Sequence, residues 1–209
     1  NALPSIEIPS RISSALTSTL EKIREMELKS LKKADAIICP SFVIKSFLET
    51  LGVDSNKITV IHNGARISGI EHKKPETAPD KYIIYIGAVQ PWQGVECLMK
   101  AMTFLKDISD LKLVFCASGT KPRIKFLQKL AEKIEISDKL VWNLRIGQSE
   151  VQDWLQGASI SLAPLTECER NLVQGCCPIK IVESMAAGIP VIASNMPVTQ
   201  ELLEHNITG

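Results

Sequence analysis

The chain has 209 residues, of which 45% are hydrophobic and 22% are charged, and its formal net charge is +1. This composition is typical of a globular protein with one large domain, or with one domain and part of a second. The small net charge argues against nucleic acid as a partner, and no apolar stretch reaches the ~20 residues that a membrane-spanning helix needs.

The amino-terminal part of the sequence predicts a long helix followed by a strand, a helix and a second strand. Residues 10–33 carry apolar side chains three or four positions apart, which is typical of an amphipathic helix. Such a helix packs on a protein surface or lies on a membrane, and its mixed charges favour the packed arrangement. Strands are then expected at 34–41 and 56–64, with a helix at 42–52 between them.

Strands and helices alternate regularly from Tyr82 onward, after a polar stretch with two prolines at 67–81 that suits an exposed linker. The alternation predicts an α/β fold, in which a Rossmann-like parallel sheet carries helices on both faces. The expected strands are 82–87, 111–119, 139–144, 158–165 and 189–194, and the expected helices are 94–106, 121–134, 149–156, 178–187 and 197–204.

The predicted boundaries are 1–66 for the end of an amino-terminal domain, 67–81 for the linker and 82–209 for a second, truncated domain. The chain starts with Asn1 and stops on a turn, so we expect it to be part of a longer protein. Its cysteines form no CxxC pair, and two of them lie in strand-like runs. This pattern favours reduced thiols in a cytosolic protein over a zinc site. The six are Cys39, Cys97, Cys116, Cys168, Cys176 and Cys177.

Two of the loops that should follow the strands are unusual. Ligands of parallel sheets bind beyond the carboxyl ends of the strands. The loop at 87–96 is bounded by Gly87 and Gly94, which allow close backbone approach and leave helix amides available for an anion. The loop lacks a GxGxxG pattern, which disfavours dinucleotide binding. The loop at 165–177 is long and polar, and is either functional or a solvated surface loop. It carries Glu167, Glu169 and Arg170.

The helix predicted at 178–187 carries a cation where the helix dipole disfavours one. Lys180 lies in its first turn and Glu183 lies three residues later, so the two could form a surface ion pair. An anion at the helix start would instead favour Lys180, and a carboxylate one turn later could accept bonds from a ribose diol. Together these contacts describe a nucleotide site. Pro178 suits the helix start and Gly188 its end. The residues expected to face the core are Ile179, Val182 and Met185.

The stretch PIKIVESMAAGIPVIAS, residues 178–194, resembles the donor-binding signature of the retaining family-4 glycosyltransferases. This is a GT-B group with two facing Rossmann-like domains. Other blocks match in the right order over residues 30–209. They are ADAIICPS with KITVIHNG, which resemble the end of the amino-terminal domain, and YIIYIGAVQPWQGVECLMKAM, LKLVFCASG and ASISLAPL, which resemble parts of the nucleotide-sugar domain.

The resemblance implies donor-binding roles for particular residues. Glu183 matches the glutamate that binds the nucleotide ribose. The stretch from Gly175 to Lys180 matches the loop and helix start that hold the donor phosphate and sugar, and Gly87 and Gly94 match the glycines of the loop under the diphosphate. The donor-binding residues implied in this way are Glu183, Lys180, Ile179, Pro178, Cys177, Gly175, Gly87 and Gly94, and the backbone near Arg145 and Ile146 falls where the base is held.

The sequence also departs from the common family pattern. The common pattern has two glutamates with seven residues between them, and counting back from Glu183 the first falls on Gly175. The usual arginine and lysine of the first loop fall on Ala88 and Gln93, so Lys180 becomes the main candidate for the diphosphate-binding charge. Arg66 stands where an acidic residue is common. Catalytic residues stay unknown and are expected in the part of the amino-terminal domain that this sequence lacks.

The implied activity of the parent protein is transfer of a sugar from a nucleotide-sugar to an acceptor hydroxyl with retention of configuration. The resemblance implies neither a metal nor another cofactor. The acceptor, whether saccharide, lipid or small molecule, is undefined, and peripheral membrane association of the parent stays open. This chain alone should bind the donor weakly and transfer nothing. Alternatives are a non-catalytic nucleotide-sugar-binding module and a UDP-sugar epimerase of the GT-B fold.

Overall fold

The computed structural model describes residues 3, 17–67, 73–144 and 146–209 of the chain. These residues form two compact units, each of which is built from separate parts of the sequence. Unit 1 draws on 1–63, 167–177 and 195–201, and unit 2 on 64–166, 178–194 and 202–209. Segments 167–177 and 195–201, which follow the predicted linker in the sequence, therefore belong to the same unit as the amino-terminal elements. The predicted domain boundaries at 66 and 81 stay a prediction.

Unit 2 contains a five-stranded sheet whose strand order is β5-β4-β3-β6-β7, with every neighbouring pair parallel. This order confirms the α/β fold predicted from the alternating elements. The observed strands are up to two residues shorter at each end than the apolar runs that predict β5, β6 and β7, because those runs continue into the flanking turns. The strands are β3 (Lys81–Ala88), β4 (Leu111–Ser118), β5 (Leu140–Asn143), β6 (Ile160–Ala163) and β7 (Val191–Ala193).

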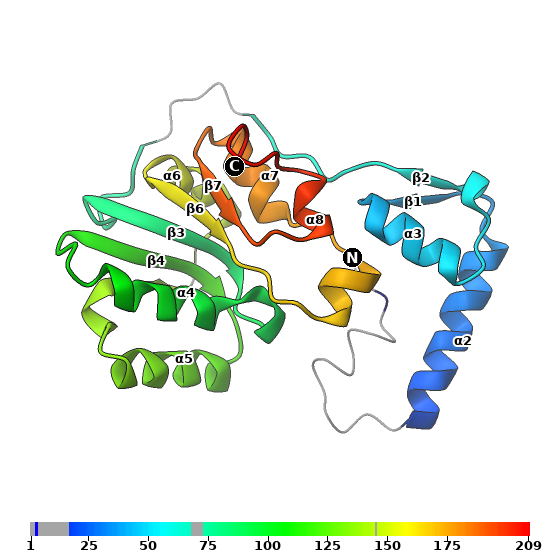
Figure 1. Ribbon diagram of the computed structural model, residues 1–209, viewed down its shortest axis with the longest axis horizontal. Coiled ribbons are helices and arrows are strands. Elements are labelled where there is room, and N and C mark those ends of the chain that lie inside the picture. The colour runs from blue at the N-terminus through cyan, green and yellow to red at the C-terminus, as the bar shows by residue number, and fades with distance from the viewer. Residues whose placement is uncertain (1–2, 4–16, 68–72, 145) are drawn as a thin grey trace. The chain divides into compact units, whose positions relative to one another are not determined.

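Helices cover both faces of this sheet (Figure 1). One face packs against α4 (Val95–Met102) and α5 (Lys121–Lys133), and the other packs against α6 (Val151–Gln156) and α7 (Ile179–Ala186). Strand β3 lies at the centre and alternates between the two cores. Tyr82 and Tyr85 are both fully buried, but they belong to opposite faces. The two-sided burial explains why β3 reads as an almost continuous apolar run.

Unit 1 contains a parallel pair of short strands, β1 (Ile37–Cys39) and β2 (Ile58–Val60), joined by helix α3 (Phe42–Thr50). Before them comes α2 (Thr17–Lys33), which confirms the carboxyl-terminal part of the helix predicted at 10–33; positions 10–16 lie outside the described residues. The strands are shorter than predicted because their flanks are turns. In the described part of the chain, no helix is both long and apolar enough to cross a membrane.

The loop predicted at 165–177 as functional or solvated belongs to unit 1 over most of its length, from 167 to 177. It contains a π-helical turn, Arg170–Gln174, in which the side chains of Asn171 and Gln174 are buried. The polar composition suggested exposure here, and the acidic residues Glu167 and Glu169 do face solvent, whereas Arg170 is half-buried. The solvated-loop alternative therefore holds for these two positions and is wrong for Asn171 and Gln174 in the turn that follows them.

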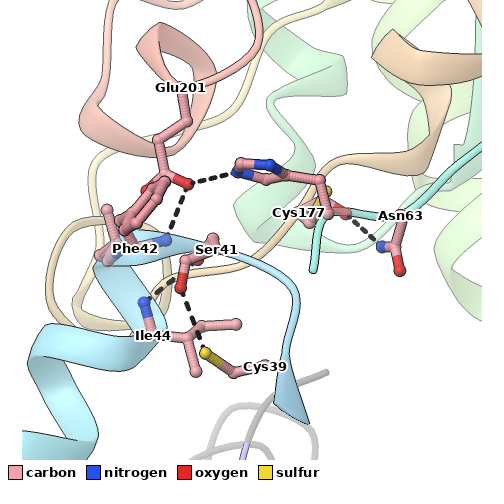
Figure 2. Close-up of polar contacts among 9 residues, drawn as sticks. Cys39, Ser41, Phe42, Ile44, Asn63, Cys177 and Glu201 are labelled. Atoms are coloured by element: carbon pink, nitrogen blue, oxygen red, sulfur yellow. Dashed lines mark hydrogen bonds and ion pairs between the residues drawn. The ribbon is translucent and has the colours of Figure 1, made fainter. Parts of the chain in front are cut away.

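The start of helix α3 is capped by a carboxylate from the second half of the chain. Glu201 follows the short helix α8 (Pro197–Gln200), and its two oxygens accept hydrogen bonds from the amides of Phe42 and Val43, both at 2.8 Å (Figure 2). The Ser41 hydroxyl accepts from the next amide, and His62 Nε2 lies 3.1 Å from the same carboxylate. Because the first amides of a helix have no partner within it, these contacts tie 195–201 to the amino-terminal elements of unit 1.

Replacing Glu201 by alanine is expected to lower the free energy of unfolding by about 1–2 kcal/mol, since a charge-assisted cap at a helix start is lost. Urea denaturation followed by circular dichroism measures the loss. Glu204→Ala is the matched control, because the Glu204 side chain is exposed three residues further on. Equal stability of the two variants would show that the cap contributes nothing.

Candidate functional site

The order of strands reverses beside β3, which has β4 on one side and β6 on the other. In open parallel sheets, ligands bind at such a switch point, in the crevice beyond the carboxyl ends of the strands. The loop that follows β3 contains a short 3-10 turn, Pro91–Gln93, and ends at Gly94, which caps helix α4. This loop, the start of α7 and the predicted base-binding region at 145–146 are the predicted parts of the donor site that belong to unit 2.

Gly94 is required by packing. Its φ of +70° is in the left-handed region, and an added Cβ would lie 1.6 Å from the carbonyl oxygen of Pro164, which follows β6. No side chain fits there without moving the backbone. Close by, the amide of Thr166 donates to the carbonyl of Trp92 at 3.1 Å. The two loops at the switch point are thus held against each other.

Lys180 reaches from the first turn of α7 to the loop that follows β3. Its Nζ donates to Tyr85 Oη at 3.1 Å and to Gln93 Oε1, and it lies 4.2 Å from the centroid of the Tyr85 ring. Gly87, with a φ of +132°, lies beneath the ammonium group, and an added Cβ would lie 3.4 Å from Nζ. The structure therefore brings together two predicted donor-binding residues, Lys180 and Gly87. It adds Tyr85 and Gln93, which sequence reasoning did not assign to the site.

The Tyr85 hydroxyl has a defined role in this cluster. It donates its proton to the carbonyl of Ala88 at 2.6 Å, so it accepts from Lys180. Burial raises the pKa of Tyr85 far above its usual value, with the Arg123 charge opposing the shift and Glu96 adding to it. The phenol therefore stays protonated and neutral near neutral pH.

An ion pair holds the same loop from its other side. Arg123, near the start of α5, donates through Nε to the carbonyl of Val89 at 2.8 Å and through Nη2 to Glu96 at 2.6 Å. The two charged side chains are 18% and 29% exposed, so solvent screens the pair only in part. Arg123 was not assigned to the site from the sequence, because no local pattern indicates that a residue of α5 contacts this loop.

Glu183 lies one turn after Lys180, and among the residues that the structure describes no ion pair joins these two side chains. Its Oε1 accepts a hydrogen bond from Gln148 Nε2 at 3.1 Å. Gln148 begins the 3-10 turn Gln148–Glu150 after β5, two residues beyond the predicted base-binding position Ile146. Ile146 packs partly buried against the core, and Arg145 lies outside the described residues. Gln148 is thus another site residue that the sequence did not reveal.

The prediction of which face of α7 meets the core was wrong. Ile179 and Met185 are 48% and 41% exposed, whereas Ile181 and Ser184 are fully buried. The polar Ser184 is accommodated because its hydroxyl bonds Ser161 Oγ at 2.7 Å and the Lys180 carbonyl at 2.6 Å. The helix ends are close to prediction: Pro178 is the N-cap, one residue before the predicted position, and Gly188 follows the C-cap with a φ of +72°.

Gly175 and Cys177, two further predicted donor-binding residues, belong to unit 1. Gly175 has a φ of +85°, and an added Cβ would lie 2.9 Å from the amide nitrogen of Ile44. The carbonyl of Cys177 accepts a bond from Asn63 Nδ2 at 3.4 Å (Figure 2). Packing alone accounts for both contacts, so their predicted roles in donor binding stay predictions.

All six cysteines are free thiols, and none of the buried ones is activated. Burial raises the pKa of the Cys116 thiol to about 12, and burial likewise raises the pKa of the Cys39, Cys176 and Cys177 thiols. Among the residues that the structure describes, no three or more histidine, cysteine, aspartate or glutamate side chains gather in a way that could hold a metal ion.

The sequence matches two protein-family models. The model described as Glycosyl transferases group 1 matches residues 69–209, more than half of the chain. The chain belongs to this family. A second model, described as Glycosyltransferase Family 4, matches residues 8–68. The matches confirm the family resemblance inferred from the ordered sequence blocks, in both parts of the chain.

Several curated relatives of this group 1 glycosyltransferase chain match it over most of its length. The O-antigen chain mannosyltransferase RfbU of Salmonella typhimurium is 27% identical over 84% of this chain and 46% of its own length. The alpha-monoglucosyldiacylglycerol synthase of Streptococcus pneumoniae is 24% identical over 86% of this chain and 42% of its own length. The chain thus spans about half the length of the curated relatives it matches.

Solved structures confirm the fold of the group 1 glycosyltransferase chain. Anabaena HepE in complex with UDP and glucose matches with a TM-score of 0.75 and 16% identity, over 90% of this chain and 52% of that one. The galactosyltransferase WaaB of the lipopolysaccharide outer core, in its apo form, matches with a TM-score of 0.61 and 20% identity, over 84% of this chain and 48% of that one.

Proposed function

We propose that this chain carries the donor-binding half of a glycosyltransferase, which transfers a sugar from a nucleotide-sugar to an acceptor hydroxyl with retention of configuration. One observation carries the proposal. The ammonium group of Lys180 is held over Gly87 at the switch point of the sheet, and the Glu183 carboxylate lies one helical turn away. Family membership supports a nucleotide-sugar as the ligand, and so does the similar HepE structure, which is a complex with UDP and glucose.

Lys180 supplies the positive charge for the diphosphate. A phosphate at the start of α7 meets the helix amides and this ammonium group together, and both interactions favour an anion. Gly87 allows the phosphate to approach the backbone, because no Cβ projects from it. The same contacts stabilise the charge that develops on the diphosphate as it leaves, and this requires no metal ion.

Glu183 supplies acceptors for the ribose hydroxyls. A carboxylate offers about four acceptor positions on its two oxygens. The hydrogen bond from Gln148 occupies one of them and orients the group, so capacity for two ribose hydroxyls remains. The base then lies toward Ile146 and its neighbours, which follow β5 at the same edge of the sheet.

The transfer breaks the bond between the anomeric carbon and the diphosphate oxygen and forms a bond from that carbon to the acceptor oxygen. The nucleoside diphosphate leaves with the electron pair, and the acceptor hydroxyl loses its proton to a base outside the donor site. Calorimetric titration with UDP-, GDP- and ADP-sugars tests donor binding, and NAD serves as the negative control. Binding of none of these sugars would favour a non-catalytic module and contradict the proposal.

Replacing Glu183 by alanine is expected to weaken binding of UDP roughly tenfold, because bonds from the ribose to a charged acceptor are lost. Binding of inorganic pyrophosphate should not change, since pyrophosphate has no ribose. Calorimetry with the two ligands measures the difference. Glu132→Ala on the exposed face of α5 is the matched control. A parallel loss of affinity for UDP and pyrophosphate would rule out the ribose contact.

A further inference from the structure

We propose that Tyr85 and Gln93 are positioning residues for Lys180, which hold its ammonium group over Gly87 without neutralising it. The inference rests on the proposed function, since it assigns this ammonium group to the diphosphate of the donor. The sequence assigns no role to Tyr85, and Gln93 stands where the family pattern has a lysine. The two residues lie 95 and 87 positions before Lys180 in the chain.

Two acceptor oxygens restrain the Lys180 side chain. A lysine side chain has a flexible four-carbon stem, and fixing it in one conformation costs about 2 kcal/mol of rotamer entropy. Here Nζ donates to Tyr85 Oη at 3.1 Å and to Gln93 Oε1, and these oxygens come from strand β3 and from the turn that follows it. Tyr85 lies in the central strand β3, and Gln93 lies in the turn just after that strand. The entropy is therefore lost on folding rather than on ligand binding.

The two side chains that hold the Lys180 ammonium group are neutral. Both oxygens belong to uncharged groups, so these two contacts orient the ammonium group without pairing its charge. A carboxylate in place of the Gln93 amide would form an ion pair with Lys180, and a phosphate would have to compete with it. Tyr85 also offers the face of its ring to Nζ, 4.2 Å from the centroid, which attracts a cation without cancelling it.

The Tyr85 side chain is itself held in place. Tyr85 is fully buried, and its proton is used in the 2.6 Å bond to the Ala88 carbonyl. Its lone pairs are thus left to face Lys180. Gln93 Oε1 lies 3.4 Å from the same hydroxyl, so the two acceptors converge on one point. The carbonyl at Ala88, the phenol, the amide and the ammonium group form one connected network above Gly87.

The first test needs no ligand. The rate at which an N-hydroxysuccinimide ester labels Lys180 is followed by mass spectrometry in the wild type, Tyr85→Phe and Gln93→Leu. We expect labelling to be about three- to tenfold faster in each variant, because the loss of one hydrogen bond to Nζ leaves the amine less restrained. Tyr82→Phe is the matched control: it lies on the same strand and is equally buried, but its hydroxyl donates to the Trp154 carbonyl on the opposite face. An unchanged rate in both variants would overturn the inference.

The second test is a double-mutant cycle on pyrophosphate and UDP affinity. Tyr85→Phe and Gln93→Leu should each weaken binding about three- to tenfold when Lys180 is present, and less than about twofold in the Lys180→Met background. Equal losses in both backgrounds would mean that the residues act independently of Lys180. Failure of the wild type to bind either ligand would refute the proposed function, while the labelling experiment would still decide the inference.

A charge swap completes the test. Gln93→Glu keeps an acceptor for Lys180 but pairs its charge, so it should reduce pyrophosphate affinity more than Gln93→Leu does. Gln93→Lys combined with Lys180→Met should restore affinity to within about fivefold of the wild type, because the two side chains reach one point and a single cation there suffices. If this double variant bound no better than Lys180→Met alone, the two positions would not share a cation site.

Discussion

Replacing Lys180 by methionine is expected to weaken the binding of UDP and of pyrophosphate roughly 10- to 100-fold, the effect of losing a charge-assisted hydrogen bond. Methionine keeps the length and most of the packing of the lysine stem, so the charge is the main property removed. Calorimetry with the two ligands measures the loss. Because the proposed contact of the ammonium group is with the diphosphate and not with the ribose, both ligands should be affected alike, in contrast to Glu183→Ala.

The stability of the same variant should barely change. A cation at the second position of α7 opposes the helix dipole at a cost of about 0.3–1 kcal/mol, and methionine removes that cost. The variant also loses the bonds from Nζ to Tyr85 and Gln93, which act in the opposite direction. We therefore expect the free energy of unfolding to stay within about 1 kcal/mol of the wild type. Lys129→Met, on the exposed face of α5, is the matched control.

Two results would contradict the role assigned to Lys180. One is unchanged affinity for pyrophosphate, and the other is a loss of affinity that follows a large loss of stability. A residue whose removal weakens binding but not folding is placed for function, because folding alone gives no reason to retain a cation at a helix start.

The sheet of unit 2 could be predicted because its strands are buried on both faces. Strand β3 reads as an apolar run for this reason, and the alternation of elements then implies parallel order. The face of α7 could not be predicted in the same way. Ser184 is polar yet buried, and its hydroxyl bonds both Ser161, on a different element, and the Lys180 carbonyl within the helix. A serine in a sequence does not reveal whether such a partner exists.

In the candidate site, too, residues that belong to a local sequence pattern differ from residues that act through contacts with distant elements. Gly87, Lys180 and Glu183 could be predicted because each belongs to a local pattern at a strand end or a helix start. Tyr85 and Gln148 contribute through side-chain contacts that join elements far apart in the chain. Such contacts depend on the packing of whole helices against the sheet, which neither periodicity nor spacing encodes. The packed turn at Arg170–Gln174 was missed for a related reason, since its buried polar side chains resemble those of a solvated loop.

Restoring the glutamate that is usual at position 175 is expected to destabilise the protein rather than improve donor binding. Gly175 has φ +85° and ψ 166°, a conformation that only glycine adopts readily. A Cβ would also lie 2.9 Å from both the Ile44 amide nitrogen and Val43 Cγ1 at the start of α3. Strain and overlap together should lower the free energy of unfolding by roughly 3 kcal/mol or more in Gly175→Glu.

The variant Gly188→Glu separates the effect of backbone strain from the effect of steric overlap. Gly188 has a similar φ of +72°, but nothing lies within 4 Å of its added Cβ, so this variant suffers strain without overlap and should lose only about 1–2 kcal/mol. Urea denaturation of both variants gives the comparison, and a titration with UDP-glucose reports on donor binding. If Gly175→Glu were as stable as Gly188→Glu and bound the donor more tightly, position 175 would be open to a carboxylate. The expected opposite result means that packing against α3 has fixed glycine at this position. The charged contacts that we propose for the donor would then be made by Lys180 and Glu183.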